Sequence, residues 1–254
     1  FPSSQNGSYK LSNTMNYYNP YIENDVQERR ITELFQESII TAYQEDSINF
    51  SSFDLIVVFH AGIGQDFSLP FLDPTPEDIP STYIDQKMIS DNLNQAGIAI
   101  GEHLIDRGII LPESQNHLLY DIAESMFGDA TDPCEYQYGL TGTFALMVGF
   151  AIGLPPLWNI ESGESRVGVF GLMDQGSNNG RGFIPAPPTA WSRIYAGWEA
   201  PVEPDFNSEM YLPLRGDGNI IKIPITDQEY YLIENRSNHC LLYTSPSPRD
   251  LRKS

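Results

Sequence analysis

Several residue types are scarce in this sequence, and each shortage excludes a class of protein. Two cysteines in 254 residues cannot build a disulfide framework. Lysine and arginine number 14 against 34 aspartates and glutamates, which leaves a formal net charge of −20. Because so acidic a surface repels phosphate backbones, we expect no nucleic-acid partner. The chain also lacks an apolar run of about 18 residues, so we expect no membrane span in this fragment.

Histidines and complete catalytic motifs are scarce as well. The four histidines are His60, His103, His117 and His239, and no two of them lie three or four positions apart. Two zinc-binding histidines on one helix need that spacing. The G-x-S-x-G elbow of serine hydrolases is absent too. The chain therefore contains neither a histidine pair that could bind zinc from one helix nor the motif of a serine hydrolase.

Apolar residues make up 41% of the chain, which is enough for a folded core. Residues 1–24 are rich in Asn, Ser and Tyr and are predicted to form a loop. The clearest helix follows them, with Asp25 as its predicted N-cap and Glu28 as the reciprocal capping partner. Apolar side chains then recur at helical spacing and predict one buried face. That face consists of Ile31, Leu34, Phe35, Ile39 and Ala42.

Short apolar runs and turn residues predict the other elements. Residues 53–59 are predicted to form a buried strand that ends in a His-Ala-Gly turn, and 86–110 a hairpin or an excursion at a sheet edge. A buried helix is predicted at 141–152 and a tight turn at 170–177. The remaining predicted elements are a loop at 65–83, a helix at 114–126, an acidic turn at 128–139, a helix at 189–197, and strands at 220–225 and 229–235.

Five blocks of sequence occur in the order found in one family of secreted enzymes. They are FDLIVVFHAGIG at 53–64, GLPPLWN at 153–159, FGLMDQGSNNG at 170–180, TAWSRIYAGW at 189–198 and YYLIENR at 230–236. Together they resemble the immune inhibitor A-like zinc metallopeptidases. The resemblance implies an α/β (α+β) zincin-like fold with a mixed sheet and a buried former active-site helix. It also implies an extracellular or cell-surface location, and a structural Met-turn at Met173.

The resemblance places the family's H-E-x-x-H motif on the helix before GLPPLWN, where this chain departs from the motif. The two zinc histidines fall at Leu146 and Phe150, and the general base falls at Met147. Leucine and phenylalanine have no lone pair for a metal, and methionine offers only a weak thioether. Pro156 also stands where the family commonly has an aspartate. We therefore expect no zinc at this helix.

Other ligand sets are weaker. His60 and His103 are the histidines left for a displaced zinc site, although turn-stabilising or exposed roles are commoner for such residues. Calcium is a better expectation than zinc, because acidic loops supply the oxygen ligands that calcium takes. Solvated acidic turns are the alternative interpretation of these loops. The calcium candidates are Asp129, Asp132, Glu135 and Asp174.

The sequence therefore predicts three segments: an N-terminal loop segment at 1–24, a metallopeptidase-like domain at 25–239 that is truncated at its C-terminus, and a non-native tail at 240–254. The tail is basic and rich in Ser and Pro, and it resembles translated adapter sequence. The expected function is a secreted or cell-surface module that binds a protein or glycan and has lost zinc and proteolysis. The alternative is an active secreted metallopeptidase with displaced metal ligands.

Overall fold

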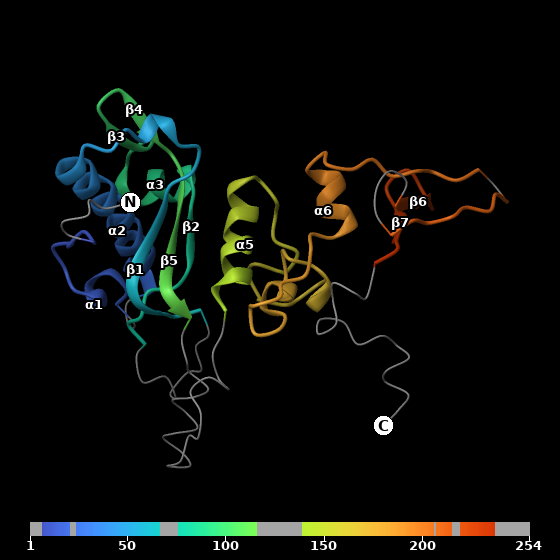
Figure 1. The fold of residues 1–254 in the computed structure, drawn as a ribbon, viewed down its shortest axis with the longest axis horizontal. Helices are drawn as coiled ribbons and strands as arrows, with labels where there is room; N and C mark the ends of the chain where they lie inside the picture. The colour runs from blue at the N-terminus through green and yellow to red at the C-terminus, as the bar shows by residue number, and fades with distance from the viewer. Residues whose placement is uncertain are drawn as a thin grey trace, which may run out of the picture. The chain divides into compact units, whose positions relative to one another are not determined.

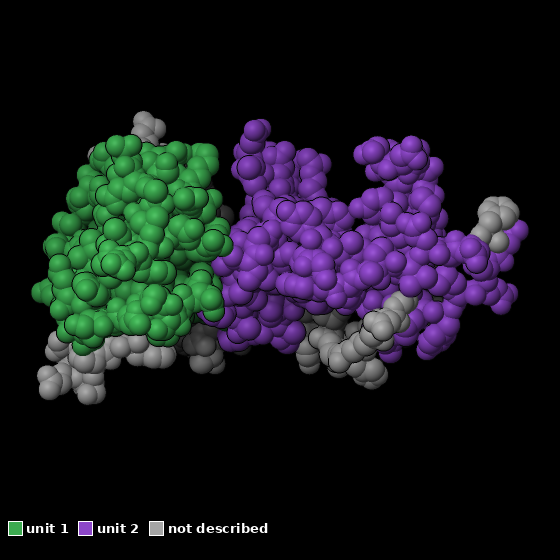
Figure 2. Space-filling view, turned by 90° about the horizontal axis from the view of Figure 1, so that it is seen from above, with its two compact units in different colours: residues 1–140 green, residues 141–254 purple. Residues whose placement is uncertain are grey.

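The computed structural model describes residues 7–20, 24–66, 76–115, 139–205, 207–214 and 219–236. Contacts divide the chain into two compact units, Phe1–Leu140 and Thr141–Ser254, which Figure 2 colours separately. The division falls inside the single domain that the sequence predicts over 25–239. Each unit combines helices with small sheets, so the expectation of a mixed α+β fold is confirmed at this level.

Unit 1 is built around a three-stranded mixed sheet and a long helix. Strand β5 is central, parallel to β1 and antiparallel to β2, while β3 and β4 form a separate hairpin. Figure 1 draws the helices α2 and α3 beside this sheet. The elements are α1 (Met15–Tyr18), α2 (Asn24–Asp46), η1 (Phe50–Ser52), β1 (Val57–Gly64), β2 (Thr82–Ile84), α3 (Gln86–Leu93), β3 (Ile98–Ile100), β4 (His103–Ile105) and β5 (Gly108–Gln115).

Helix α2 supplies much of the core of unit 1. Its predicted apolar face is confirmed, and Phe35 and Ile39 on that face are almost fully buried. A Cβ atom added to Gly108 of β5 would lie 2.2 Å from the ring of Phe35. Glycine at this position therefore lets the helix pack directly on the strand. The helix ends before Ser47, which has a left-handed backbone (φ 53°) and donates its N–H to the carbonyl of Tyr43.

The predicted boundaries of the first strand are wrong. The strand β1 begins at Val57 and continues through His-Ala-Gly, because β5 pairs with it on both sides of a register shift between His60 and Ile63. A shift of this kind is a bulge, which bends a strand without ending it. The prediction of a buried strand is also wrong, since Phe53 and Phe59 are each 58% exposed.

The region predicted as a hairpin or edge excursion contains an additional helix. Helix α3 begins where the side chain of Asp85 accepts the N–H of Met88 at 2.7 Å, and it ends at Asn94 in a left-handed conformation. The hairpin itself is confirmed as β3 and β4. Strand β5 takes up the first two residues of the helix predicted at 114–126, and the rest of that segment lies outside the described residues.

The segment predicted as an N-terminal loop contains the short helix α1 and contributes to the core. Tyr18 at the end of α1 is 2% exposed. Tyr9, Leu11 and Met15 pack against the same cluster as Tyr18. The segment is therefore part of unit 1.

Unit 2 contains two helices, two short 3-10 turns and a hairpin in the part that the structure describes. The predicted helices at 141–152 and 189–197, the turn at 170–177 and the two C-terminal strands are all confirmed, within one or two residues at their ends. The elements are α5 (Leu140–Ala151), η3 (Gly168–Phe170), η4 (Gln175–Asn178), α6 (Ala190–Tyr195), β6 (Ile220–Pro224) and β7 (Tyr230–Glu234).

Helix α5 is less buried than the sequence predicts. Gly142, Thr143 and Gly149 are its buried residues. Phe144 is 40% exposed and Ile152, just past the helix end, is 55% exposed. The buried glycines let α5 approach the rest of unit 2 closely. Its larger apolar side chains remain partly exposed to solvent.

Candidate functional site around helix α5

Helix α5 carries the three positions at which the family resemblance places zinc chemistry. Leu146 and Phe150 lie one helical turn apart, are half-buried, and pack against one apolar cluster. The ring of Phe150 meets Trp158 edge-on, with centroids 5.8 Å apart. Zinc takes nitrogen, thiolate or oxygen ligands, so Leu146, Met147 and Phe150 do not fit it. The buried members of the cluster are Leu154, Leu172 and Met173.

Met173 lies against the same helix. Its side chain is fully buried, and a Cβ added to Gly149 would lie 2.5 Å from its sulfur atom. Glycine at position 149 thus makes room for the methionine. The carbonyl of Met173 accepts the N–H of Leu157 at 2.8 Å, which ties the turn to the segment after the helix. The turn therefore contacts α5 by packing and the following segment by a backbone hydrogen bond.

The chain reverses directly after α5. Gly153 has a left-handed backbone (φ 90°), which glycine adopts without the steric cost of a Cβ. The N–H of Leu154 then donates to the carbonyl of Gly149 at 2.9 Å, closing the helix end. Leu154 is buried in the cluster, and Pro156 beyond it is half-buried. This reversal carries the Gly-Leu-Pro segment back across the turn that holds Met173.

Asp174, one of the calcium candidates, is buried and holds the loop beside this turn. Its Oδ2 accepts hydrogen bonds from the Ser165 hydroxyl and from the N–H groups of Arg166, Val167 and Gly168, all at 2.8–2.9 Å. Burial by itself raises the pKa of Asp174, but these hydrogen bonds outweigh it and the net pKa lies below the ordinary value. The oxygen faces four donors, an arrangement that favours a loop-holding role over cation binding.

Replacing Asp174 with asparagine should destabilise unit 2 by about 2 kcal/mol, because the amide has a single acceptor oxygen. Its NH2 must then face an N–H donor, either that of Gln175 or those on the Oδ2 side. The measurement is the free energy of unfolding by urea, followed by tryptophan fluorescence, since all three tryptophans lie in unit 2. Asp227→Asn is the matched control, because Asp227 is exposed in the turn between β6 and β7. Equal losses in the two variants would contradict the loop-holding role.

An ion network joins α6 to β7. Glu234 accepts from Arg193 at 2.7 Å and from Arg236 at 2.6 Å, and Arg193 also lies 3.2 Å from Glu199. Arg193 and Glu234 have side chains only 14% and 18% exposed. Arg236 further donates to the carbonyl of Phe170 at 2.5 Å, so the network reaches the loop that precedes the Met173 turn. These bonds connect the hairpin of β6 and β7 to α6 and to the loop at Phe170.

Low pH should weaken the ion pairs of Glu234 and so destabilise unit 2. Burial by itself raises the pKa of Glu234, but hydrogen bonds from Arg236 and Arg193 and their positive charges bring the net pKa below 4.5. The ionised carboxylate therefore stabilises unit 2 above about pH 4.5, and that contribution disappears as the pH falls through the lowered pKa. In Glu234→Gln the stability difference between pH 7 and pH 4 should shrink, as measured by urea unfolding. Glu209→Gln, an exposed control, should leave that difference unchanged.

The two weaker zinc candidates lie in unit 1, in different sheets. The ring nitrogens of His60 lie 3.0 Å and 3.1 Å from the carbonyl oxygens of Ala61 and Ile79. Both nitrogens therefore already face backbone oxygens. His103 begins β4, where it pairs with Ile100 of the hairpin. In the described parts of both units, no three His, Cys, Asp or Glu side chains are grouped so as to hold a metal ion. Asp129, Asp132 and Glu135 lie outside those parts.

Sequence analysis missed one buried, hydrogen-bonded aspartate and one ion network. Asp66, after β1, accepts the N–H and the hydroxyl of Ser81, each at 2.7 Å, which ties this strand end to the start of β2. Burial raises the pKa of Asp66, although hydrogen bonds from Ser81 and Gln115 oppose the rise. The ion network is that of Arg193. Its signal was present in the sequence, since the block at 189–198 carries Arg193 and the block at 230–236 carries Glu234 and Arg236.

Comparison with known proteins gives no match: no protein-family model, no curated protein and no solved structure is similar to this chain. Within the described residues, no helix has the length and apolar character needed to cross a membrane.

Proposed function

We propose that this chain is a zinc-free relative of the immune inhibitor A-like metallopeptidases, with a zincin-like fold, that binds a protein or glycan without cleaving it. The observation that carries the proposal is the packing of α5. Leu146 and Phe150 stand at the family's histidine positions and contact the apolar cluster around Met173. A helix that has lost a metal is stabilised by apolar side chains in the vacated space, since these need no polar partner.

The position of Met173 also supports the kinship. The resemblance implies a methionine turn that lies under the zinc, and here the Met173 side chain contacts α5 at Gly149, between positions 146 and 150 in sequence. The segment Gly153–Leu157 returns across this turn through the hydrogen bond from Leu157 to Met173. The contacts among helix, reversal and turn support the proposed kinship.

A binding role fits the surface of unit 2. Large aromatic side chains stand exposed there, with Trp198 at 52%, Tyr195 at 58% and Tyr211 at 87%. Exposed aromatic rings commonly contribute to protein and glycan recognition, because they offer a large apolar face and a polar edge. The extracellular or cell-surface location belongs to the proposal through the family resemblance.

The test is the metal content and the peptidase activity of the purified chain. We expect zinc well below one atom per chain by elemental analysis, and no casein cleavage above a buffer blank. Stoichiometric zinc together with casein cleavage that a chelator abolishes would overturn the proposal. In that case His60→Ala and His103→Ala would show whether displaced ligands carry the activity.

A further inference from the structure

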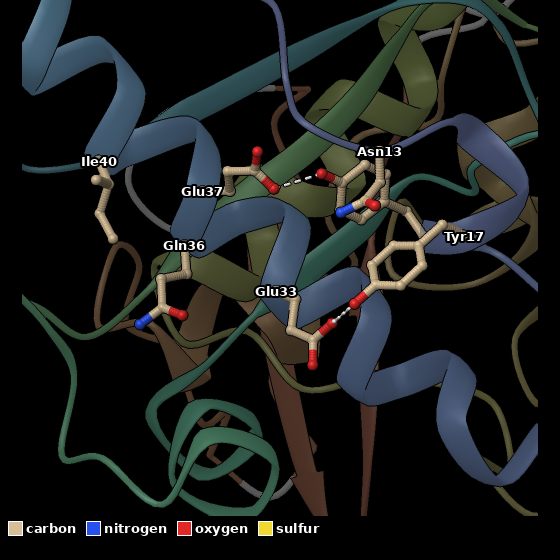
Figure 3. Close-up of a pocket in the computed structure, with 7 residues that line it drawn as sticks. Asn13, Tyr17, Glu33, Gln36, Glu37 and Ile40 are labelled. Carbon is tan, nitrogen blue, oxygen red and sulfur yellow. Dashed lines mark hydrogen bonds between the residues drawn. The ribbon is translucent and has the colours of Figure 1, made fainter.

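A cavity of about 310 Å³ opens in unit 1, between the N-terminal segment and helix α2. It is independent of the α5 site, which belongs to unit 2. The segment contributes two tyrosine rings and an amide, and α2 contributes two carboxylates, an amide and an aliphatic side chain (Figure 3). The lining residues are Asn13, Tyr17, Tyr18, Glu33, Gln36, Glu37 and Ile40.

The two carboxylates are neutralised to different degrees. Glu33 forms ion pairs with Arg30 at 2.7 Å and with Arg29 at 3.6 Å. Glu37 instead accepts from neutral donors, the N–H of Ser12 at 2.6 Å and the hydroxyl of Tyr18. Among the described residues, no basic side chain forms an ion pair with Glu37. Glu37 is therefore a half-buried carboxylate whose hydrogen-bond donors are neutral, whereas Arg29 and Arg30 pair with the neighbouring Glu33.

One aromatic wall already contacts a cation on its own chain. The guanidinium of Arg30 lies 4.0 Å from the ring centroid of Tyr17, within the range of a cation–π contact. Tyr17 and Tyr18 meet edge to face, with centroids 5.2 Å apart, which holds the two rings in fixed orientations. An aromatic ring beside a carboxylate that forms no ion pair within the described residues is a combination that recognises organic cations.

We propose that this cavity binds a small organic cation, a guanidinium or primary ammonium group on a short alkyl chain. The charged group pairs with Glu37 beside the ring of Tyr17. The alkyl chain lies toward Ile40, and the amides of Asn13 and Gln36 supply further polar contacts. The volume lies at the lower end of the range for ligand sites, which limits the occupant to a small group.

The test compares n-butylguanidinium with n-butylurea, a neutral analogue of the same shape, by NMR titration. The side-chain amide signals of Asn13 and Gln36 are the reporters, because both residues line the cavity. We expect saturable shifts with the cation and at least about tenfold weaker binding of the urea, since the attraction to a half-buried carboxylate is lost. Equal affinities for the two probes, or no saturable shift with the cation, would overturn the proposal.

Three variants separate the cavity from the general negative charge of the chain. Glu37→Gln should weaken butylguanidinium binding about tenfold, whereas Glu45→Gln, an exposed position on the same helix, should not. Ile40→Arg places a guanidinium in the lining of the cavity and should abolish the shifts. It also keeps the test informative if Glu37→Gln does not fold. Equal binding by all three variants would refute the site.

A second titration distinguishes a cation on a partner protein from a free small molecule. Acetyl-arginine amide presents the guanidinium as a protein side chain does, with the backbone blocked, whereas butylguanidinium represents a free metabolite. Tighter binding of the acetyl-arginine amide would assign the cavity to a basic side chain of a partner, and tighter binding of the free cation to a small molecule. Binding of neither probe would contradict the proposal.

Discussion

Replacing Gly142 with alanine should destabilise unit 2 by at least about 3 kcal/mol, the upper end of what overpacking usually costs. A Cβ at this position would lie 1.7 Å from the carbonyl oxygen of Ser177 and 2.8 Å from its carbon. These are backbone atoms, so no rotamer change relieves the contact. The N–H of Gly142 also donates to the carbonyl of Gly182 at 2.8 Å, which fixes the helix start against the same loop.

The expected loss of stability is opposite in sign to the effect of the same substitution in a free helix. In a free helix, glycine to alanine stabilises by roughly 0.5–1 kcal/mol, so the helix alone would favour the substitution. We would measure urea unfolding by tryptophan fluorescence. Gly149→Ala should cost less, because the flexible end of Met173 can move away, and exposed Thr141→Ala should be close to neutral. A Gly142→Ala variant as stable as the parent would mean that the helix does not approach Ser177 this closely.

The elements that sequence analysis predicted are those whose signal is local. The apolar side chains of α2 recur at helical spacing, so its buried face, including Phe35 and Ile39, follows from the sequence alone. The strands 220–225 and 229–235 were equally clear. Helix α3 was missed because it is short, and its start depends on one capping side chain, Asp85. The glycines that follow α3 favoured a hairpin over the whole region, but the hairpin consists only of β3 and β4.

Features that depend on distant pairing could not be predicted. The first strand extends through His60 because β5, about 50 positions further on, continues to pair with it beyond the bulge. The approach of Gly142 to Ser177 and the pairing of Arg193 with Glu234, 41 positions apart, are likewise non-local. What the sequence did predict at the site is the shared helix face of Leu146 and Phe150, since four-residue spacing fixes it.

Introducing the residues of the proposed family should create a zinc site on α5. The variant carries Leu146→His, Met147→Glu and Phe150→His, together with Pro156→Asp. Two imidazoles one turn apart and a carboxylate from the returning segment would then supply three protein ligands, the number typical of catalytic zinc. We expect stoichiometric zinc by elemental analysis. Zinc should also raise the melting temperature, because a ligand that binds only the folded state stabilises it by about 2.7 kcal/mol at a hundred times its Kd.

The matched control is Phe144→His with Val148→His, which keeps the four-residue spacing on another face of the same helix. Leu146 and Phe150 face the cluster around Met173, whereas Phe144 is 40% exposed. Any helical histidine pair binds some zinc, so the informative quantity is the excess affinity of the restored variant over the control. That excess requires the segment containing residue 156 to lie beside the helix face of Leu146 and Phe150, as in the proposed zincin-like arrangement. A folded restored variant that binds zinc no tighter than the control would separate this helix from the metallopeptidase family and remove the main support for the proposed function.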